Sequence, residues 1–126
     1  MKCTAIICEY NPLHLGHQKQ IDLIRRLYGE ETAIVCLMSG NFVQRGEMAI
    51  LNKFTRAKHA VMAGADMGIE LPTVFATANA ETFAKGGINL INSLGVCDGI
   101  CFGVESGSAT DYMSLARVLV DESKEY

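Results

Sequence analysis

Two histidines three residues apart form the pattern in this sequence that is best suited to chemistry. His14 and His17 enclose Leu15-Gly16, after a short apolar run and at the start of a stretch with helical spacing. The N-terminus of a helix offers unpaired N–H groups and a positive dipole end to an anion. Residues three apart share one side of the first turn, so both imidazoles can donate hydrogen bonds to phosphate oxygens whose charge grows during transfer. The pattern therefore predicts phosphate chemistry, with Gly16 leaving room for a base or ribose and Pro12 fixing the entry turn.

Two other interpretations of these histidines stay open. They could be surface or helix-capping side chains, or they could bind a metal ion, for which Glu9 and His59 are the only weak further candidates. We predict no metal site. The first apolar run is followed by neither GxGxxG nor GxxxxGK(S/T), which argues against a dinucleotide-binding Rossmann domain and against a P-loop NTPase.

Apolar runs alternate with helical patterns along the chain and would position these residues. The expected strands are 3–8, 32–38, 67–71 and 99–104, and the expected helices are 14–28, 54–63, 77–94 and 108–122. This order is typical of βαβ units around a parallel sheet, whose crossovers are right-handed. The sequence therefore predicts an α/β fold, a Rossmann-like three-layer sandwich with a parallel sheet. Gly86 and Gly87 weaken the expected helix 77–94 in its middle.

Ligands of such sheets bind outside the carboxyl ends of the strands. Polar residues and glycines follow each expected strand there, in 9–17, 39–47, 72–73 and 103–107. The stretch 44–60 is basic and holds Arg45, Lys53 and Arg56. It is either a solvated helix face or a contact for the phosphates of a nucleotide or an RNA, and Arg45 is the best candidate because its loop follows a strand.

Three further residues have open roles. Gly103 is either a plain turn glycine or a point where the backbone approaches a ligand closely. Glu70 is either the partner of a base or a carboxylate at the ligand edge of the sheet. We expect Ser106 to cap the last helix.

The composition indicates one cytoplasmic domain, residues 1–126. Of the 126 residues 49% are hydrophobic and 20% charged, which excludes a disordered chain, and no apolar run is long enough to span a membrane. The net charge is −3, so a nucleic-acid or membrane partner would have to meet a local patch. Five cysteines without a CxxC pattern predict small buried hydrophobic side chains in a reducing compartment, in preference to a disulfide framework or a zinc site.

Four segments together resemble one family of the HxGH nucleotidyltransferase superfamily, which includes the class I aminoacyl-tRNA synthetases. The family is that of the bacterial tRNA(Met) cytidine acetate ligases. The matching segments are EYNPLHLGH (9–17), MSGNFVQRGE (38–47), IELP (69–72), and SLGV with CFGVES (93–96 and 101–106). The resemblance covers essentially the whole chain and implies the HIGH-motif type of the sandwich.

This resemblance implies an activity, its substrates and a binding segment. ATP, together with Mg²⁺, would activate acetate as acetyl-AMP, and the acetyl group would pass to N4 of the wobble cytidine of elongator tRNA(Met). His14 and His17 would be catalytic. The implied ATP-binding residues are Ile7, Cys8, Glu9, Tyr10, Asn11, Pro12, Leu13, His14, Leu15, Gly16, His17, Gln18, Lys19, Gln20 and Gly103.

The chain also departs from the family pattern. It has four strand–helix units and no KMSKS-like segment, and Met48 stands where the similar pattern RGEP has proline. We therefore expect the chain to be the N-terminal part of a longer protein. Two other functions stay open: a small-molecule nucleotidyltransferase that releases pyrophosphate from ATP or CTP, and a nucleotide-binding or RNA-binding module without turnover. A homo-oligomer also stays open.

Overall fold

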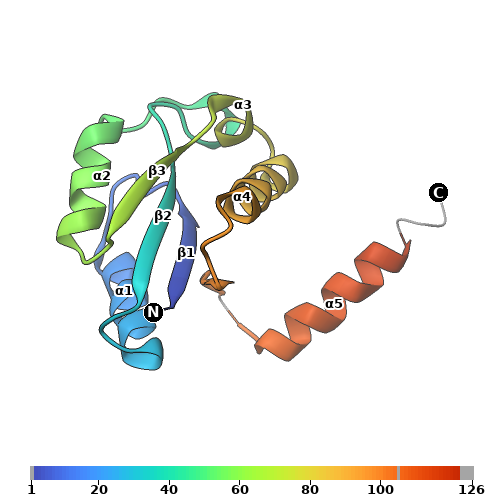
Figure 1. Ribbon diagram of the computed structural model, residues 1–126. Coiled ribbons are helices and arrows are strands. Elements are labelled where there is room, and N and C mark those ends of the chain that lie inside the picture. The colour runs from blue at the N-terminus through green and yellow to red at the C-terminus, as the bar shows by residue number, and fades with distance from the viewer. Residues whose placement is uncertain (1, 105, 123–126) are drawn as a thin grey trace.

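A parallel sheet between two layers of helices forms the body of the chain in the computed structural model, which describes residues 2–104 and 106–122 (Figure 1). The strand order is β3-β2-β1-β4. The strands are β1 (Cys3–Cys8), β2 (Ala33–Ser39), β3 (Met67–Leu71) and β4 (Gly99–Ile100). The helices are α1 (Leu15–Tyr28), the 3₁₀ turn η1 (Gln44–Gly46), α2 (Lys53–Met62), α3 (Thr73–Ala76), α4 (Ala80–Leu94) and α5 (Ala109–Glu122). The predicted α/β sandwich is confirmed.

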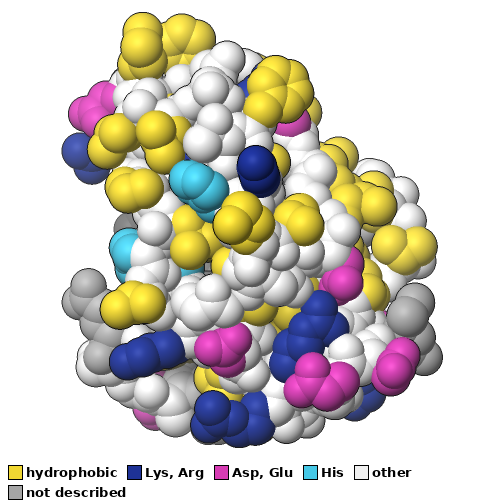
Figure 2. Space-filling model, turned by 90° about the vertical axis from the view of Figure 1, so that its left-hand side faces the viewer, with side chains coloured by type: hydrophobic (Ala, Val, Ile, Leu, Met, Phe, Trp, Pro, Cys, Tyr) yellow, Lys and Arg dark blue, Asp and Glu magenta, His cyan; other side chains and the backbone are white. Residues whose placement is uncertain are grey.

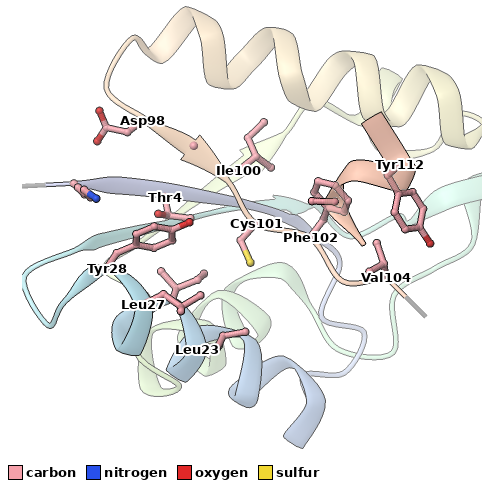
Figure 3. A pocket seen from close by; sticks show the side chains of 14 residues that line it. Thr4, Leu23, Leu27, Tyr28, Asp98, Ile100, Cys101, Phe102, Val104 and Tyr112 are labelled. Carbon is pink, nitrogen blue, oxygen red and sulfur yellow. The ribbon is translucent and has the colours of Figure 1, made fainter. Parts of the chain in front are cut away.

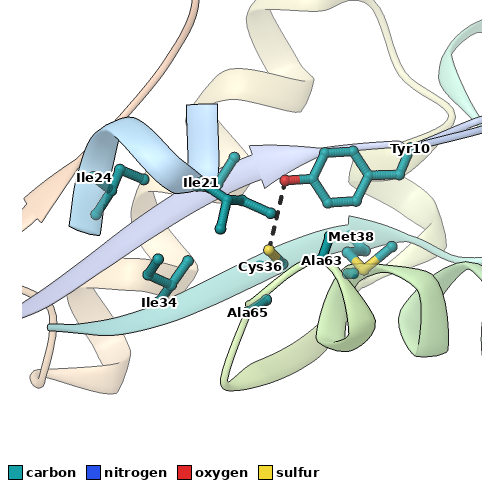
Figure 4. Packing of buried hydrophobic residues seen from close by; sticks show 10 residues of the cluster. Tyr10, Ile21, Ile24, Ile34, Cys36, Met38, Ala63 and Ala65 are labelled. Carbon is teal, nitrogen blue, oxygen red and sulfur yellow. Dashed lines mark hydrogen bonds between the residues drawn. The ribbon is translucent and has the colours of Figure 1, made fainter. Parts of the chain in front are cut away.

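Different helices cover the two faces of the sheet. α1 and α2 lie on one face, and α3 and α4 lie on the other (Figure 1). Because successive residues of a strand point to opposite faces, Ile6 joins the core beneath α1 and α2, whereas Ala5 joins the core beneath α4. Figure 4 shows the first core, in which Ile21 and Ile24 of α1 pack with Ile34 of β2. The period of two in the strands and of 3.6 in the helices sets which side chains are buried.

A side-chain cap sets the start of α4. The Oδ1 atom of Asn79 accepts the N–H of Thr82 at 2.9 Å, so the helix begins at Ala80. The prediction of a helix from residue 77 is wrong at that end, because residues 77–79 connect the separate short helix α3 to the capped start of α4. Gly95 ends α4 in the left-handed region, with φ of 66°.

Two glycines inside α4 have a packing reason. A Cβ atom on Gly86 would lie 2.4 Å from Cγ of Phe75, and one on Gly87 would lie 2.6 Å from Cδ1 of Ile7. Real Cβ atoms do not come this close to their neighbours, so the glycines let α4 approach α3 and β1. Close packing compensates for the low helix propensity of glycine at these positions.

The expected strand 99–104 pairs over only two residues. Gly99 and Ile100 lie beside Thr4 and Ala5 of β1. After one more main-chain bond, from Cys101 N to the carbonyl of Ala5 at 2.9 Å, the chain leaves the sheet. The prediction of a strand to residue 104 is therefore wrong, because within residues 2–104 and 106–122 no strand pairs with the outer edge of β4.

Helix α5 projects from the sandwich (Figure 1). Its cap is Ser108, whose Oγ accepts the N–H of Asp111 at 3.3 Å, while Oδ2 of Asp111 accepts the N–H of Ser108 at 2.8 Å. The prediction that Ser106 caps this helix is wrong, since its carbonyl instead accepts the hydroxyl of Tyr112 at 2.8 Å. Apolar side chains such as Met113 remain exposed on α5.

All five cysteines are free thiols, and Cys3 and Cys36 are buried in the core. The Sγ atoms of Cys3 and Cys97 lie 3.5 Å apart. Burial, together with this contact, raises the pKa of the Cys3 thiol to about 11. Within the described ranges, no helix combines the length and the apolar character needed to cross a membrane.

Candidate active site

A groove of about 980 Å³ opens at the carboxyl end of β1, between the loop that follows this strand, the first turns of α1 and residues 101–104. Its volume lies at the upper end of the range of about 300–1,000 Å³ that is usual for small-molecule sites. It is lined by Ile6, Ile7, Cys8, Glu9, Tyr10, Asn11, Pro12, His14, Gly16, His17, Lys19, Gln20, Leu23, Cys101, Phe102, Gly103 and Val104. The topology therefore brings Gly103 next to the HxGH segment from the other end of the chain.

Three residues of the continuous segment 7–20 lie outside this groove. Leu13 packs against the core beneath α1 and α2, and Leu15 is 80% exposed. The Nε2 atom of Gln18 donates to the carbonyl of Ala63 at 2.7 Å and to Oδ1 of Asp22 at 3.0 Å. A helix turns about 100° per residue, so only one side of α1 faces the groove, and Leu15 and Gln18 lie on the other side.

The two motif histidines form a stacked pair at the start of α1. Nδ1 of His14 accepts the N–H of Gly16 at 3.1 Å, and Nδ1 of His17 accepts the N–H of His14 at 3.2 Å. The ring centroids are 3.6 Å apart. Because each Nδ1 accepts a hydrogen bond, the neutral ring carries its proton on Nε2. The capping interpretation and the phosphate interpretation are thus compatible, since capping uses Nδ1 and leaves Nε2–H as a donor.

The electrostatics of the site favour a neutral ring at His17. Burial lowers the pKa of His17, and a charge on His14 would lower it further. The ring of Tyr10 also lies 4.8 Å from that of His17, centroid to centroid. The site therefore presents His17 at neutral pH as an uncharged N–H donor.

The family model for HIGH Nucleotidyl Transferase matches residues 1–126. The chain belongs to the HIGH nucleotidyl transferase family. Two curated relatives are tRNA(Met) cytidine acetate ligases: one from Clostridium novyi (strain NT) is 49% identical and one from Acetivibrio thermocellus is 46% identical, each over 126 residues. The match covers 100% of this chain and 31% and 30% of those proteins, so the chain spans about a third of their length.

A solved structure shows the same fold in a protein with a nucleotide analogue. The crystal structure of Thermotoga maritima TmcAL bound with alpha-thio ATP has a TM-score of 0.90 and 39% identity. The match covers 97% of this chain and 29% of that chain. The resemblance to the tRNA(Met) cytidine acetate ligases that the sequence motifs indicated is confirmed.

In this HIGH nucleotidyl transferase chain, residues 101–104 also line the groove. A Cβ atom on Gly103 would meet no atom of the described residues within 4 Å, so the space beside it is open. Nε2 of Gln20 donates to the carbonyl of Cys101 at 3.3 Å and ties this wall to α1. Glu105 of the matching CFGVES segment lies outside the described residues.

Two of the basic residues lie away from the groove. Arg45 is exposed in η1 and has a φ of 66°. Nζ of Lys53 forms an ion pair with Oε2 of Glu70 at 2.6 Å. Glu70 is thus the partner of a base, which is one of its two predicted roles. The ion pair also lies at the carboxyl edge of the sheet, where the other predicted role placed this carboxylate.

The third basic residue, Arg56, fits neither of its two predicted roles, a solvated helix face or a phosphate contact. Its side chain is fully buried, and its guanidinium donates to main-chain carbonyls. The prediction of a phosphate contact is wrong for Arg56 for this reason. The stretch 44–60 is also less uniformly basic than expected, because Met48 and Phe54 are both 76% exposed. Figure 2 shows hydrophobic side chains gathered in the upper part of this side of the molecule, with more charged side chains below.

Sequence reasoning missed part of the groove lining. Leu23 lies three residues after Gln20 and four after Lys19 on the same side of α1, and this helical spacing is the available signal. Phe102 and Val104 flank Gly103 and were placed in a strand. A neighbouring apolar hollow of about 560 Å³ extends from these residues toward Tyr28 (Figure 3). Among the residues that the structure describes, no three His, Cys, Asp or Glu side chains gather to hold a metal ion.

Proposed function

We propose that this chain carries the ATP-using, acetate-activating site of a tRNA(Met) cytidine acetate ligase. The observation that carries the proposal is the stacked pair of His14 and His17, because both line the groove and neither Nε2 has a partner in the described part of the chain. The names of the relatives and the ATP analogue in the Thermotoga neighbour support it. The proposal places the reaction in the cytoplasm.

The proposed reaction has two steps. A carboxylate oxygen of acetate attacks the α-phosphorus of ATP, and the bond from that phosphorus to the bridging oxygen breaks, so acetyl-AMP forms and pyrophosphate leaves. The N4 amine of the wobble cytidine of elongator tRNA(Met) then attacks the acetyl carbon. The amine loses a proton, and AMP leaves with the electrons of the broken C–O bond.

The residues of the groove would act in the first step. Nε2–H of His14 and of His17 would donate to phosphate oxygens, where negative charge grows in the transition state. A neutral donor held by its own Nδ1 bond needs no reorganisation during the reaction. Mg²⁺ would enter with ATP, bound chiefly by the phosphate oxygens, and would neutralise part of their charge; within the described residues no three His, Cys, Asp or Glu side chains gather to hold the ion by themselves.

A chimaera tests the proposal. Residues 1–126 would replace the matching 126 residues of the Clostridium novyi relative, whose full length supplies the remainder. We expect acetate-dependent exchange of pyrophosphate into ATP and transfer of labelled acetate to a tRNA(Met) transcript. His14→Ala and His17→Ala should each lower the exchange rate by about 10²- to 10³-fold.

Other results would point to other functions. A folded chimaera that shows neither acetate-dependent exchange nor acetyl transfer would overturn the proposal. Pyrophosphate release with phosphopantetheine or nicotinate mononucleotide, independent of RNA, would instead indicate a small-molecule nucleotidyltransferase. Binding of ATP that survives both histidine substitutions, without turnover in the unsubstituted protein, would indicate a binding module.

A further inference from the structure

A buried arginine lies directly behind the proposed ATP site. The Arg56 side chain is fully inaccessible to solvent. Its Nε donates to the carbonyl of Leu51 at 3.0 Å, and Nη1 donates to the carbonyl of Glu9 at 2.5 Å. Nη2 donates to the carbonyl of Ser39 at 3.0 Å and to that of Gly40. One guanidinium therefore joins the ends of β1 and β2 to the segment that precedes α2.

Further hydrogen bonds tie the same two loops together. The N–H of Gln44 donates to Oε1 of Glu9 at 3.1 Å, and the N–H of Ile50 donates to Oδ1 of Asn11 at 2.8 Å. Glu9 and Asn11 line the groove and begin the segment that leads to His14. The loop 40–52 thus supports the groove from behind, with Arg56 at the junction of the two loops.

The chemistry of Arg56 does not suit simple core packing. None of the ion pairs among the described side chains involves its guanidinium; burial lowers its pKa, and the carboxylates of Glu9 and Glu70 oppose this only from longer range. A buried charge with no ion-pair partner is unfavourable compared with an apolar side chain of similar volume. An apolar side chain cannot bind carbonyl groups. The planar, forked guanidinium of arginine instead holds four carbonyls from three segments in fixed positions.

We infer that Arg56 is a positioning residue for the groove: it holds the main chain of Glu9 against the end of β2 and thereby sets the place of the histidine-bearing segment. It acts through Glu9 and does not touch the ligand. The inference rests on the proposed ATP site. Displacements of about 1 Å far from the reacting atoms can cost about 100-fold in rate, so a clamp of this kind matters for function.

Two substitutions separate geometry from charge. Arg56→Lys keeps the charge and loses the fork, and Arg56→Met loses both. In the 126-residue chain we expect faster hydrogen exchange at the amides of Gln44 and Ile50 in both variants, by about tenfold. We also expect ATP affinity, measured by calorimetry, to fall about 10- to 100-fold in both. The matched control is Arg26→Met, an exposed arginine of α1, which should change neither quantity.

The outcomes are separable. Unchanged amide exchange in both variants overturns the inference, as does faster exchange with unchanged ATP affinity. An Arg56→Lys variant that behaves like the unsubstituted chain would show that charge alone matters and would also overturn it. If the unsubstituted chain does not bind ATP, the proposed function fails, while amide exchange still decides whether Arg56 holds the loops.

If Arg56→Lys and Arg56→Met fail to fold, two other measurements still test the inference. In the unsubstituted chain the Nε–H of Arg56 should exchange with water about 100-fold more slowly than that of an exposed arginine, and an equal rate overturns the inference. In Arg56→Ala, guanidinium ion at low millimolar concentration should restore ATP affinity, whereas the same concentration of urea, which is neutral and of similar shape, should not.

Discussion

The imidazole of His17 accepts the main-chain N–H of His14 at 3.2 Å, and the two rings stack with their centroids 3.6 Å apart. Each histidine thus uses Nδ1 to hold the start of α1, which leaves Nε2 toward the groove. Helix capping and the proposed phosphate binding use different atoms of the same side chains. Substitutions that imitate one nitrogen at a time can separate the two roles.

Substitution of His17 by asparagine or by glutamine should separate helix capping from phosphate binding. In His17→Asn the amide oxygen can take the place of Nδ1, so stability should be kept while adenylation in the chimaera falls about 10²- to 10³-fold. In His17→Gln the amide nitrogen can take the place of Nε2 while the amide oxygen accepts the N–H of His14, as in a capping box, so activity should be better kept than in His17→Asn. Pyrophosphate exchange and urea unfolding measure the two effects. Parallel losses in both variants would show that the roles are not separable.

The stability of the chain should depend on pH through His17. Its pKa is lower in the folded state than the usual value of 6.5 for histidine, because the charged ring is disfavoured by burial and by His14. The unfolded chain therefore binds more protons between the two pKa values, and stability falls as the pH drops below about 6.5. Urea unfolding between pH 8 and pH 5 measures this. The fall should be smaller in His17→Asn, and an equal fall would assign the effect to other groups.

Adjacent residues of α1 should respond differently to the same substitution. Lys19 lines the groove, so Lys19→Met should weaken ATP binding by about fivefold through the loss of an exposed charge. Gln18 donates to Ala63 and Asp22 instead, so Gln18→Met should leave ATP binding unchanged and lower stability by about 1 kcal/mol. Calorimetry with ATP and urea unfolding test the pair. Equal effects on ATP binding would contradict the placement of the groove.

Gly86 provides a test of the packing between α3 and α4. Helix propensity alone predicts that Gly86→Ala stabilises the chain by roughly 0.5–1 kcal/mol. The contact with Phe75 predicts the opposite, a loss of about 1–3 kcal/mol, because the new Cβ would overlap the ring. A second variant, Gly86→Ala with Phe75→Leu, should recover part of the loss. Stabilisation by the single substitution would refute the close approach.

The sequence allowed the sheet and the histidine pair to be predicted, because both follow from local periodicity. The residues of β1 form an apolar run interrupted only by Thr4, and the HxGH segment begins a helical pattern. Arg56 could not be predicted, because its burial depends on carbonyls from segments up to 47 residues away in the chain. The strand β4 was predicted, but its end at Ile100 was not, since the pairing of a strand depends on neighbours that its own residues do not encode.

Within the described residues, every acceptor of the Arg56 guanidinium is a main-chain carbonyl, and carbonyls are present whatever the side chain. The half-buried Leu51 can therefore be substituted while the guanidinium keeps its acceptor there, whereas Gly40 is held for another reason, because a Cβ atom would overlap the carboxylate of Glu70. Methods that find contacts from correlated substitutions should accordingly detect no partner for this arginine, although it joins three segments of the fold.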